Sequence, residues 1–341
     1  MSNTSSRRTL LTTAVGLGVC AVTRPVLARA GAAEAGAVDA LLDQALADGA
    51  TSLLVMRGDQ VLAERYAPGW SADRPREVAS VAKSLVAVLI GMAIDDGFIR
   101  DLDQPAADFI PQWAGDERRA ITLRHLMSMT SGLDDAGLAL RGVRGDQFAL
   151  NAAAPLRATP GTRWAYNTPA YHLLFHILVR ATGETVESHA ERRLLGPLGM
   201  GHTRWITNGG QGADGPVTNY YSAASTARDL APFGMLVMDG GQWGGRPLVS
   251  AGFVREMTTA SQTLNPSYGL LWWCNALPGT DATGQVRGHR FPRSPRETVA
   301  ALGAGGQALM LVPSQRLAVV RQGDPPRRPA LLDELLAAVA G

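Results

Sequence analysis

The stretch from about residue 80 to residue 96 constrains the fold most, because it is apolar on almost every side. Placed on a helix, its Val, Leu, Ile and Met side chains run nearly all the way around the axis. A helix of this kind must be buried on most of its sides, with other elements packed around it. The apolar positions are Val81, Leu85, Val86, Val88, Leu89, Ile90, Met92 and Ile94.

The other expected elements place strands near both ends of the chain and helices between them. We expect a helix over 33–47, strands over 52–56 and 61–66, helices over 123–129, 169–182, 187–195 and 225–240, strands over 268–274, 299–302, 307–312 and 317–321, and a helix over 329–339. Strands at both ends imply one sheet built from distant segments. The sequence therefore predicts a single α/β (α+β) domain over 31–341, with a helical lobe inserted at about 101–215.

The first thirty residues are expected to be an export signal and to take no part in the fold. The pair Arg7-Arg8 precedes an uncharged run over 9–23, and a small-x-small cleavage pattern ends at Ala30. This is typical of a twin-arginine signal and predicts a periplasmic or secreted protein. The alternative is a membrane anchor, but the run is shorter than the ~20 residues that span a bilayer. No stable membrane insertion is expected after cleavage.

The net charge and the cysteine content bear on a nucleic-acid partner and on disulfide bonds. Without residues 1–30 the formal net charge changes from +2 to −2, so nothing indicates a nucleic-acid partner. Cys274 is then the sole cysteine, which excludes an internal disulfide. The sequence sets no oligomeric state.

The first turn of the apolar helix carries Ser80 and Lys83, and Lys83 is the only lysine in the chain. Residues three apart share one helix face. A buried lysine has a lowered pKa and can act as a base, whereas arginine stays charged. A serine hydroxyl needs such a base to become a nucleophile. The alternative is structural: Ser80 begins the helix, and Lys83 extends its amine into solvent.

Further motifs favour the catalytic interpretation. Tyr166-Asn167-Thr168 precedes an expected helix, and the glycine-rich run 303–307 adjoins a C-terminal strand, where glycines let a substrate approach the backbone. Over about 53–323 the chain resembles the serine β-lactamase-like hydrolases: class C β-lactamases, D-Ala-D-Ala carboxypeptidases, related esterases and 6-aminohexanoate-dimer hydrolases. The resemblance lies in Ser80-x-x-Lys83 and Tyr166-x-Thr168, and in the stretches 125–133, 197–200, 226–230, 268–273 and 301–307.

The resemblance implies a β-lactamase/transpeptidase-like fold, an antiparallel sheet flanked by helices. It implies that Ser80 forms an acyl-enzyme, that Lys83 is the general base, and that Tyr166 shares protons with Lys83. The backbone N–H groups of Ser80 and Ala304 would form the oxyanion hole. Substrate contacts are expected at Thr168, Gly303 and Gly305. Neither a metal nor an organic cofactor is implied.

Two departures from the family pattern bear on the substrate. Thr168 replaces the usual Asn. Ala301 and Leu302 replace the cation and hydroxyl that hold a carboxylate in β-lactamases and carboxypeptidases. We therefore expect an exported serine hydrolase whose partner is a small-molecule ester or amide with a neutral acyl group. The alternatives are a D-Ala-D-Ala carboxypeptidase or β-lactamase, and a homologue that binds without catalysis.

Two other patterns have simpler explanations. His172 and His176 share a helix face, a spacing typical of metal ligands, but no adjacent Glu and no obvious third ligand accompany them. A packing role on the helix is favoured. Trp272 and Trp273 are neighbours on an expected strand, so their side chains should point to opposite faces and at most one should line a pocket.

Overall fold

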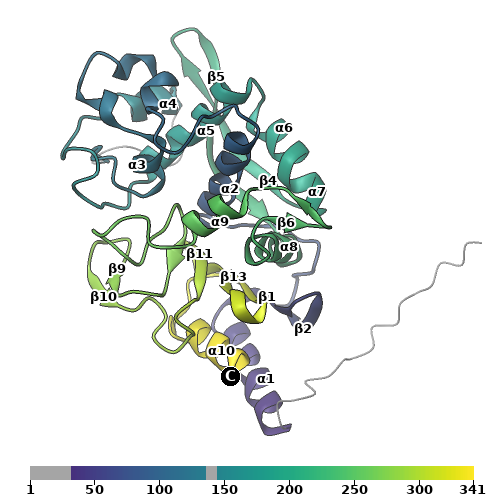
Figure 1. The fold of residues 1–341 in the computed structure, drawn as a ribbon. Helices are drawn as coiled ribbons and strands as arrows, with labels where there is room; N and C mark the ends of the chain where they lie inside the picture. The colour runs from purple at the N-terminus through teal and green to yellow at the C-terminus, as the bar shows by residue number, and fades with distance from the viewer. Residues whose placement is uncertain (1–31, 136–143) are drawn as a thin grey trace, which may run out of the picture.

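The computed structural model describes residues 32–135 and 144–341 (Figure 1). The predicted export signal lies outside these residues. Strands from the two ends of the chain lie side by side in the lower half of Figure 1, and most of the helices between them form the upper half. No helix within the described ranges has the length and apolar content needed to cross a bilayer.

The main sheet has six antiparallel strands and joins distant parts of the sequence, as predicted. Its strand order is β2-β1-β13-β12-β11-β8. The first hairpin pairs directly with the last strand, so that Val55 faces Val319. The strands are β1 (Ala50–Arg57), β2 (Gln60–Tyr66), β8 (Trp273–Cys274), β11 (Val299–Gly303), β12 (Gln307–Val312) and β13 (Leu317–Gly323).

Helices cover both faces of this sheet. All residues of β12 and β13 are buried, which requires cover on each side. Helices α1 (Ala32–Ala47) and α10 (Leu331–Ala340) contact each other and the sheet from one side. Helices α2 (Val81–Asp95) and α8 (Ala227–Met238) pack on the other side (Figure 1).

Helix α2 confirms the constraint from which the fold was predicted. Every residue from Val81 to Ala93 is buried. The helix contacts the main sheet through β11 and β12, the lobe through α5 (Thr168–Thr182), and α9 (Ala251–Met257). An element surrounded in this way holds its N-terminus fixed relative to both halves of the molecule.

The lobe is helical as far as Leu198, with short elements broken at Pro and Gly. Its anchor is Trp113, which is fully buried and donates its indole N–H to the carbonyl of Ala152. Besides α5 the elements are η1 (Ala106–Asp108), η2 (Pro111–Trp113), η3 (Glu117–Ala120), α3 (Leu123–Met127), α4 (Gln147–Ala152), α6 (Val186–Ala190), the π-helical η4 (Glu191–Leu195) and α7 (Gly196–Leu198).

The expected limit of the helical lobe near Gly215 is wrong, because a second sheet begins earlier. Strands β4 (Arg204–Gly212) and β5 (Gly215–Ser225) form a long hairpin, which the short β3 (Arg76–Glu77) joins. Three glycines within β4 gave this stretch the pattern of a loop. Aromatic packing fixes the hairpin instead: the rings of Trp205 and Tyr220 lie 5.5 and 5.4 Å from that of Phe175 on α5.

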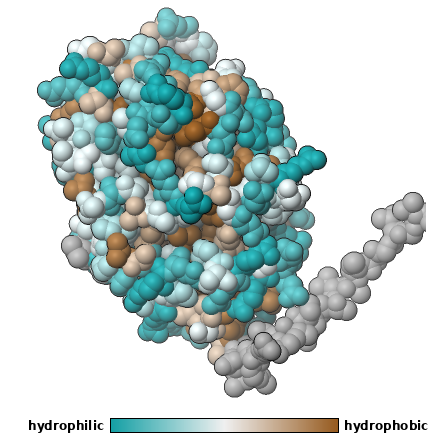
Figure 2. All heavy atoms as spheres, in the orientation of Figure 1, coloured by the Kyte–Doolittle hydropathy of each residue, from teal (hydrophilic) through white to brown (hydrophobic). Residues whose placement is uncertain are grey.

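The expected strand over 268–274 is also shorter than predicted. Only Trp273 and Cys274 pair with β11, and Tyr268 bridges back to Trp273 around a tight turn. The remaining elements are β6 (Gln242–Trp243), β7 (Arg246–Pro247), β9 (Gly279–Thr280), β10 (Val286–Gly288) and η5 (Pro313–Gln315). The surface in Figure 2 is mostly hydrophilic, with hydrophobic atoms gathered in a hollow of the upper half.

Candidate active site

Ser80 occupies the N-terminal cap of α2, and its hydroxyl is not used for capping. Its backbone has φ −70° and ψ −2°, and its side chain makes no cap hydrogen bond. A capping serine accepts a hydrogen bond from the second or third N–H of its helix. The half-buried hydroxyl of Ser80 meets the amine of Lys83 instead. The side chain is therefore available for chemistry.

The backbone next to Ser80 is strained. Ala79 has φ 47°, in the left-handed region that residues with a Cβ avoid. Two more non-glycine residues near the site share this conformation: Met129 at φ 62° and Leu271 at φ 61°. The carbonyl of Leu271 accepts a hydrogen bond from Ser84 on α2. Such strain concentrates at functional sites, where the surrounding structure holds it in place.

Lys83 is buried directly beside the serine. Its Nζ lies 3.0 Å from Ser80 Oγ and 3.2 Å from Thr168 Oγ1, and the residue is 2% exposed. Burial disfavours the charged amine and lowers the pKa of Lys83 from 10.5 to about 7. A large fraction of the amine is therefore neutral at neutral pH, and the neutral form accepts a proton from a serine hydroxyl.

The phenol of Tyr166 completes a cluster with this pair. Its ring centroid lies 5.1 Å from Lys83 Nζ. Burial raises the pKa of Tyr166 to about 12, although the neighbouring Ser80 side chain and the charge of Arg290 act in the opposite direction. The phenol is therefore protonated at neutral pH, which suits it to donate a proton.

Asn167 explains why Tyr166 and Thr168 both reach the lysine. It caps α5: its Oδ1 accepts from the N–H of Ala170 at 2.8 Å, and its Nδ2 donates to the carbonyl of Leu133 at 2.8 Å. Its two neighbours in sequence are thereby fixed beside Lys83. The nearest polar partner of the Thr168 hydroxyl is the amine, and a substrate contact for it stays a prediction.

The end of β11 lies against the backbone of the serine. A Cβ on Gly303 would lie 2.2 Å from the carbonyl of Val78 and 3.2 Å from the N–H nitrogen of Ser80, so only glycine fits. Ala304 follows and is exposed. Gly305 has φ 79°, which turns the chain into β12. The structure thus brings the expected glycine-rich run to the backbone N–H group of Ser80.

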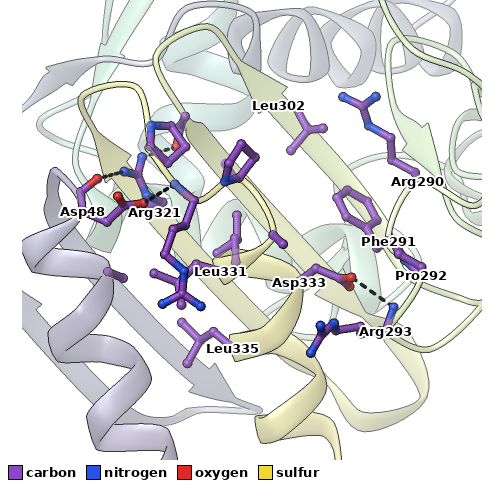
Figure 3. A pocket seen from close by; sticks show the side chains of 18 of the residues that line it. Asp48, Arg290, Phe291, Pro292, Arg293, Leu302, Arg321, Leu331, Asp333 and Leu335 are labelled. Atoms are coloured by element: carbon purple, nitrogen blue, oxygen red, sulfur yellow. Dashed lines mark hydrogen bonds between the residues drawn. The ribbon is translucent and has the colours of Figure 1, made fainter. Parts of the chain in front are cut away.

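Ala301 and Leu302, which stand where the resembled hydrolases have a cation and a hydroxyl, carry no charge. Ala301 is buried in the sheet, and the side chain of Leu302 lines a cavity. This cavity has a volume of about 800 Å³ and is bounded by α1, α10, the segment 287–293 and the β11–β12 hairpin (Figure 3).

Aromatic rings enclose the cluster. The ring of Trp273 stacks on that of Tyr166 at 6.0 Å and 13°, and Tyr268 meets Trp273 edge-on at 4.8 Å. Trp272 points the other way and packs on Phe233 at 5.9 Å. The prediction that the two tryptophans face opposite sides is confirmed. The low-polarity walls account for the shifted pKa values of the lysine and the tyrosine.

The family model described as Beta-lactamase matches residues 38–340. The chain belongs to the beta-lactamase family. It is 29% identical over 314 residues to the 6-aminohexanoate-dimer hydrolase of Paenarthrobacter ureafaciens, covering 82% of this chain and 74% of that protein. Esterase EstB of Burkholderia gladioli is 29% identical over 199 residues, 49% of this chain and 50% of the esterase.

A solved penicillin-binding protein homologue from Pyrococcus abyssi shares the fold. Its TM-score is 0.67 at 16% sequence identity, over 89% of this chain and 76% of that one. The fold is therefore the β-lactamase/transpeptidase-like fold that the sequence predicted. Because the relatives are named as hydrolases, this member of the beta-lactamase family is a serine hydrolase.

Two residues close to the cluster of Ser80, Lys83 and Tyr166 were not predicted from the sequence. The ring centroid of Tyr171 is 4.4 Å from Lys83 Nζ. Tyr171 stands one helical turn after Asn167, and that spacing was the signal that could have identified it. The guanidinium of Arg290 lies over the ring of Trp273 at 4.2 Å. Nothing in the sequence around Arg290 indicates this position.

The two histidines of α5 have partners other than a metal. His172 Nδ1 is hydrogen-bonded to the side-chain amide of Gln147 at 2.9 Å, and the ring of His176 stacks on Phe148 at 3.5 Å. Burial lowers the pKa of His172 to about 3 and that of His176 to about 4, so both are neutral. The described part of the chain holds no group of three or more potential metal ligands.

Proposed function

We propose that this serine hydrolase cleaves an ester or amide bond through an acyl-enzyme on Ser80, with a neutral acyl group. The observation that carries the proposal is the contact of 3.0 Å between Ser80 Oγ and the Lys83 amine, whose pKa is about 7. A serine hydroxyl in contact with a buried neutral amine is an activated nucleophile, because the amine can take its proton. The apolar side chains of Ala301 and Leu302 support a neutral acyl group beside β11.

Each step assigns a proton to a named atom. Lys83 Nζ accepts the hydroxyl proton as Ser80 Oγ bonds to the carbonyl carbon. The N–H groups of Ser80 and Ala304 stabilise the oxyanion, and donors of this kind are worth about 3 kcal/mol each. The tetrahedral intermediate collapses as the phenol of Tyr166 protonates the leaving amine or alcohol and takes the proton held by Lys83. Water then attacks the acyl-enzyme and releases the acid, with the same groups returning the proton to Ser80.

The test combines covalent labelling with turnover. A fluorophosphonate probe should add one adduct to the intact mass of the wild-type protein, and none to Ser80→Ala. Lys83→Arg should lose p-nitrophenyl ester hydrolysis, since arginine keeps its proton. The matched control is Ser84→Ala, the next serine on α2, whose hydroxyl bonds to a carbonyl and which should keep the adduct. An undiminished rate in Ser80→Ala or Lys83→Arg would overturn the proposal.

A substrate panel separates this proposal from its rivals. Short esters, dimers of ω-amino acids and a chromogenic β-lactam should be compared by kcat/KM. Rapid turnover of the β-lactam alone would favour a β-lactamase or carboxypeptidase. An unmodified mass with every probe would favour a binding homologue.

We also propose that residues 1–30 direct export of the folded protein. The support is the Arg7-Arg8 pair followed by an uncharged run. Changing both arginines to lysine should leave the protein in the cytoplasm of an expressing cell, as measured by fractionation. Unchanged export of that variant would contradict the proposal.

A further inference from the structure

Arg290 is a half-buried arginine whose guanidinium has no polar partner among residues 32–135 and 144–341. It forms no hydrogen bond or ion pair with them, and its described contact is the face of Trp273 at 4.2 Å. An arginine carries five N–H donors. No nitrogen of Arg290 is among the buried side-chain atoms of the described residues that lack a partner, so these donors are open to solvent and free to meet a ligand.

The neighbouring arginines do not share this property. Four other arginines line the same cavity, and each is bound to protein groups within the described chain. Arg287 is paired with Asp281, Arg293 and Arg328 with Glu334, and Arg321 donates to the carbonyls of Gly306 and Asp324. The carboxylate of Asp281 is already held by Arg287 and Thr283.

The unpaired guanidinium lies next to the catalytic cluster. Trp273, on which it rests, stacks on Tyr166. The charge of Arg290 also lowers the pKa of the Tyr166 phenol, so its field reaches that hydroxyl. Figure 3 shows Arg290 beside Leu302 at one end of the cavity, with its guanidinium directed away from Arg293. Arg290 thus stands between the cluster and the cavity.

We propose that Arg290 binds a carboxylate carried by the leaving group of the substrate. The inference rests on the proposed function, in which Tyr166 protonates the leaving atom. Trp273 stacks on Tyr166 and Arg290 lies over Trp273, so the leaving group departs toward Arg290. A planar guanidinium pairs with a carboxylate through two parallel hydrogen bonds. The charge missing at Ala301 and Leu302 is thus supplied by another segment. The preferred substrates combine a neutral acyl part with an acidic alcohol or amine part.

The test compares two esters that differ only in this charge, 3-acetoxybenzoate and its methyl ester. The wild-type protein should hydrolyse 3-acetoxybenzoate with a kcat/KM about tenfold or more above that of the methyl ester, the scale of one charge-assisted contact. In Arg290→Gln this ratio should fall to about one, and in Arg290→Lys it should be intermediate. Arg287→Gln removes an equal charge three residues away, and should keep the wild-type ratio.

Each outcome bears on one of the two proposals. A wild-type ratio near one, or an unchanged ratio in Arg290→Gln, overturns the role of Arg290 while leaving the Ser80 chemistry intact. If neither ester is hydrolysed and no probe labels Ser80, the proposed function itself fails. Product inhibition provides a second readout on the wild-type protein: 3-hydroxybenzoate should compete with substrate, and its methyl ester should compete at least tenfold more weakly.

Discussion

Replacing Lys83 with methionine should stabilise the protein at neutral pH, and by an amount that depends on pH. The pKa of Lys83 is about 7 in the folded protein against 10.5 for the free side chain. Each unit of difference corresponds to 1.36 kcal/mol, so burying this amine costs about 5 kcal/mol at pH 7 and below. Lys83→Met has a similar shape and no charge to desolvate.

The sign and the pH range follow from proton counts. Between pH 7 and 10.5 the unfolded chain holds a proton on Lys83 that the folded protein lacks, so the wild-type free energy of unfolding rises with pH. Above this range both states are neutral, and the cost disappears. The stability gap between Lys83→Met and the wild type should therefore narrow by about 2 kcal/mol between pH 7.5 and 9.

Urea unfolding at these two pH values measures the gap. Other titrating groups are common to both proteins, so they cancel in the comparison. Ser80→Ala is the control: it keeps the buried amine, so its free energy of unfolding should still rise by about 2 kcal/mol between pH 7.5 and 9. A gap that is equal at pH 7.5 and 9 would refute the argument, because the amine would then not be desolvated. The same pKa should appear as a rise in kcat/KM near pH 7 for an ester.

Three further changes test the geometry around the serine. Gly303→Ala puts a Cβ 2.2 Å from the carbonyl of Val78, so β11 must shift. Ester turnover should drop at least tenfold, and the free energy of unfolding should fall by about 1–3 kcal/mol. Retained kinetics and an unchanged melting temperature would contradict this. Ala79→Gly relieves a backbone at φ 47° and should raise the free energy of unfolding by about 1 kcal/mol in urea titrations, whereas a decrease would show that the strain is absent. Thr168→Val removes a hydroxyl that accepts a hydrogen bond from Lys83, so the pKa of the amine should fall. The rise in kcat/KM should move to lower pH by up to about one unit, and Thr168→Ser should restore the wild-type pH. Identical pH profiles of Thr168→Val and the wild type would exclude the contact.

The parts of the fold that the sequence predicted are those whose burial is complete. Residues 81–93 are apolar around the whole helix, and β12 and β13 are buried throughout, so composition alone marks them as core. The hairpin β4–β5 escaped prediction because its glycines carry no side-chain pattern. What makes it a strand pair is packing of Trp205 and Tyr220 on Phe175, a contact between distant segments that no local window contains.

The site shows the same division between local and distant information. Ser80 and Lys83 are one turn apart on a helix that the sequence predicts, so their contact followed from spacing. Tyr166 was identified by its motif, and its place beside Lys83 comes from the cap that Asn167 forms on α5. Arg290 stood outside any motif, because its importance lies in what it fails to contact within the described chain.

The arrangement of charge explains why the chain uses two different basic residues here. The polar partners of the Lys83 amine are the hydroxyls of Ser80 and Thr168, and the phenol of Tyr166 stays protonated, so no described partner stabilises the ammonium form strongly. Burial therefore sets the pKa of Lys83, and the neutral amine can act as a base. Arg290 does the opposite: it keeps its charge under any condition and rests on an aromatic face beside the cluster. An arginine at position 83 would remove the base, and a lysine at position 290 would lose the fork that binds a carboxylate, so neither exchange is conservative.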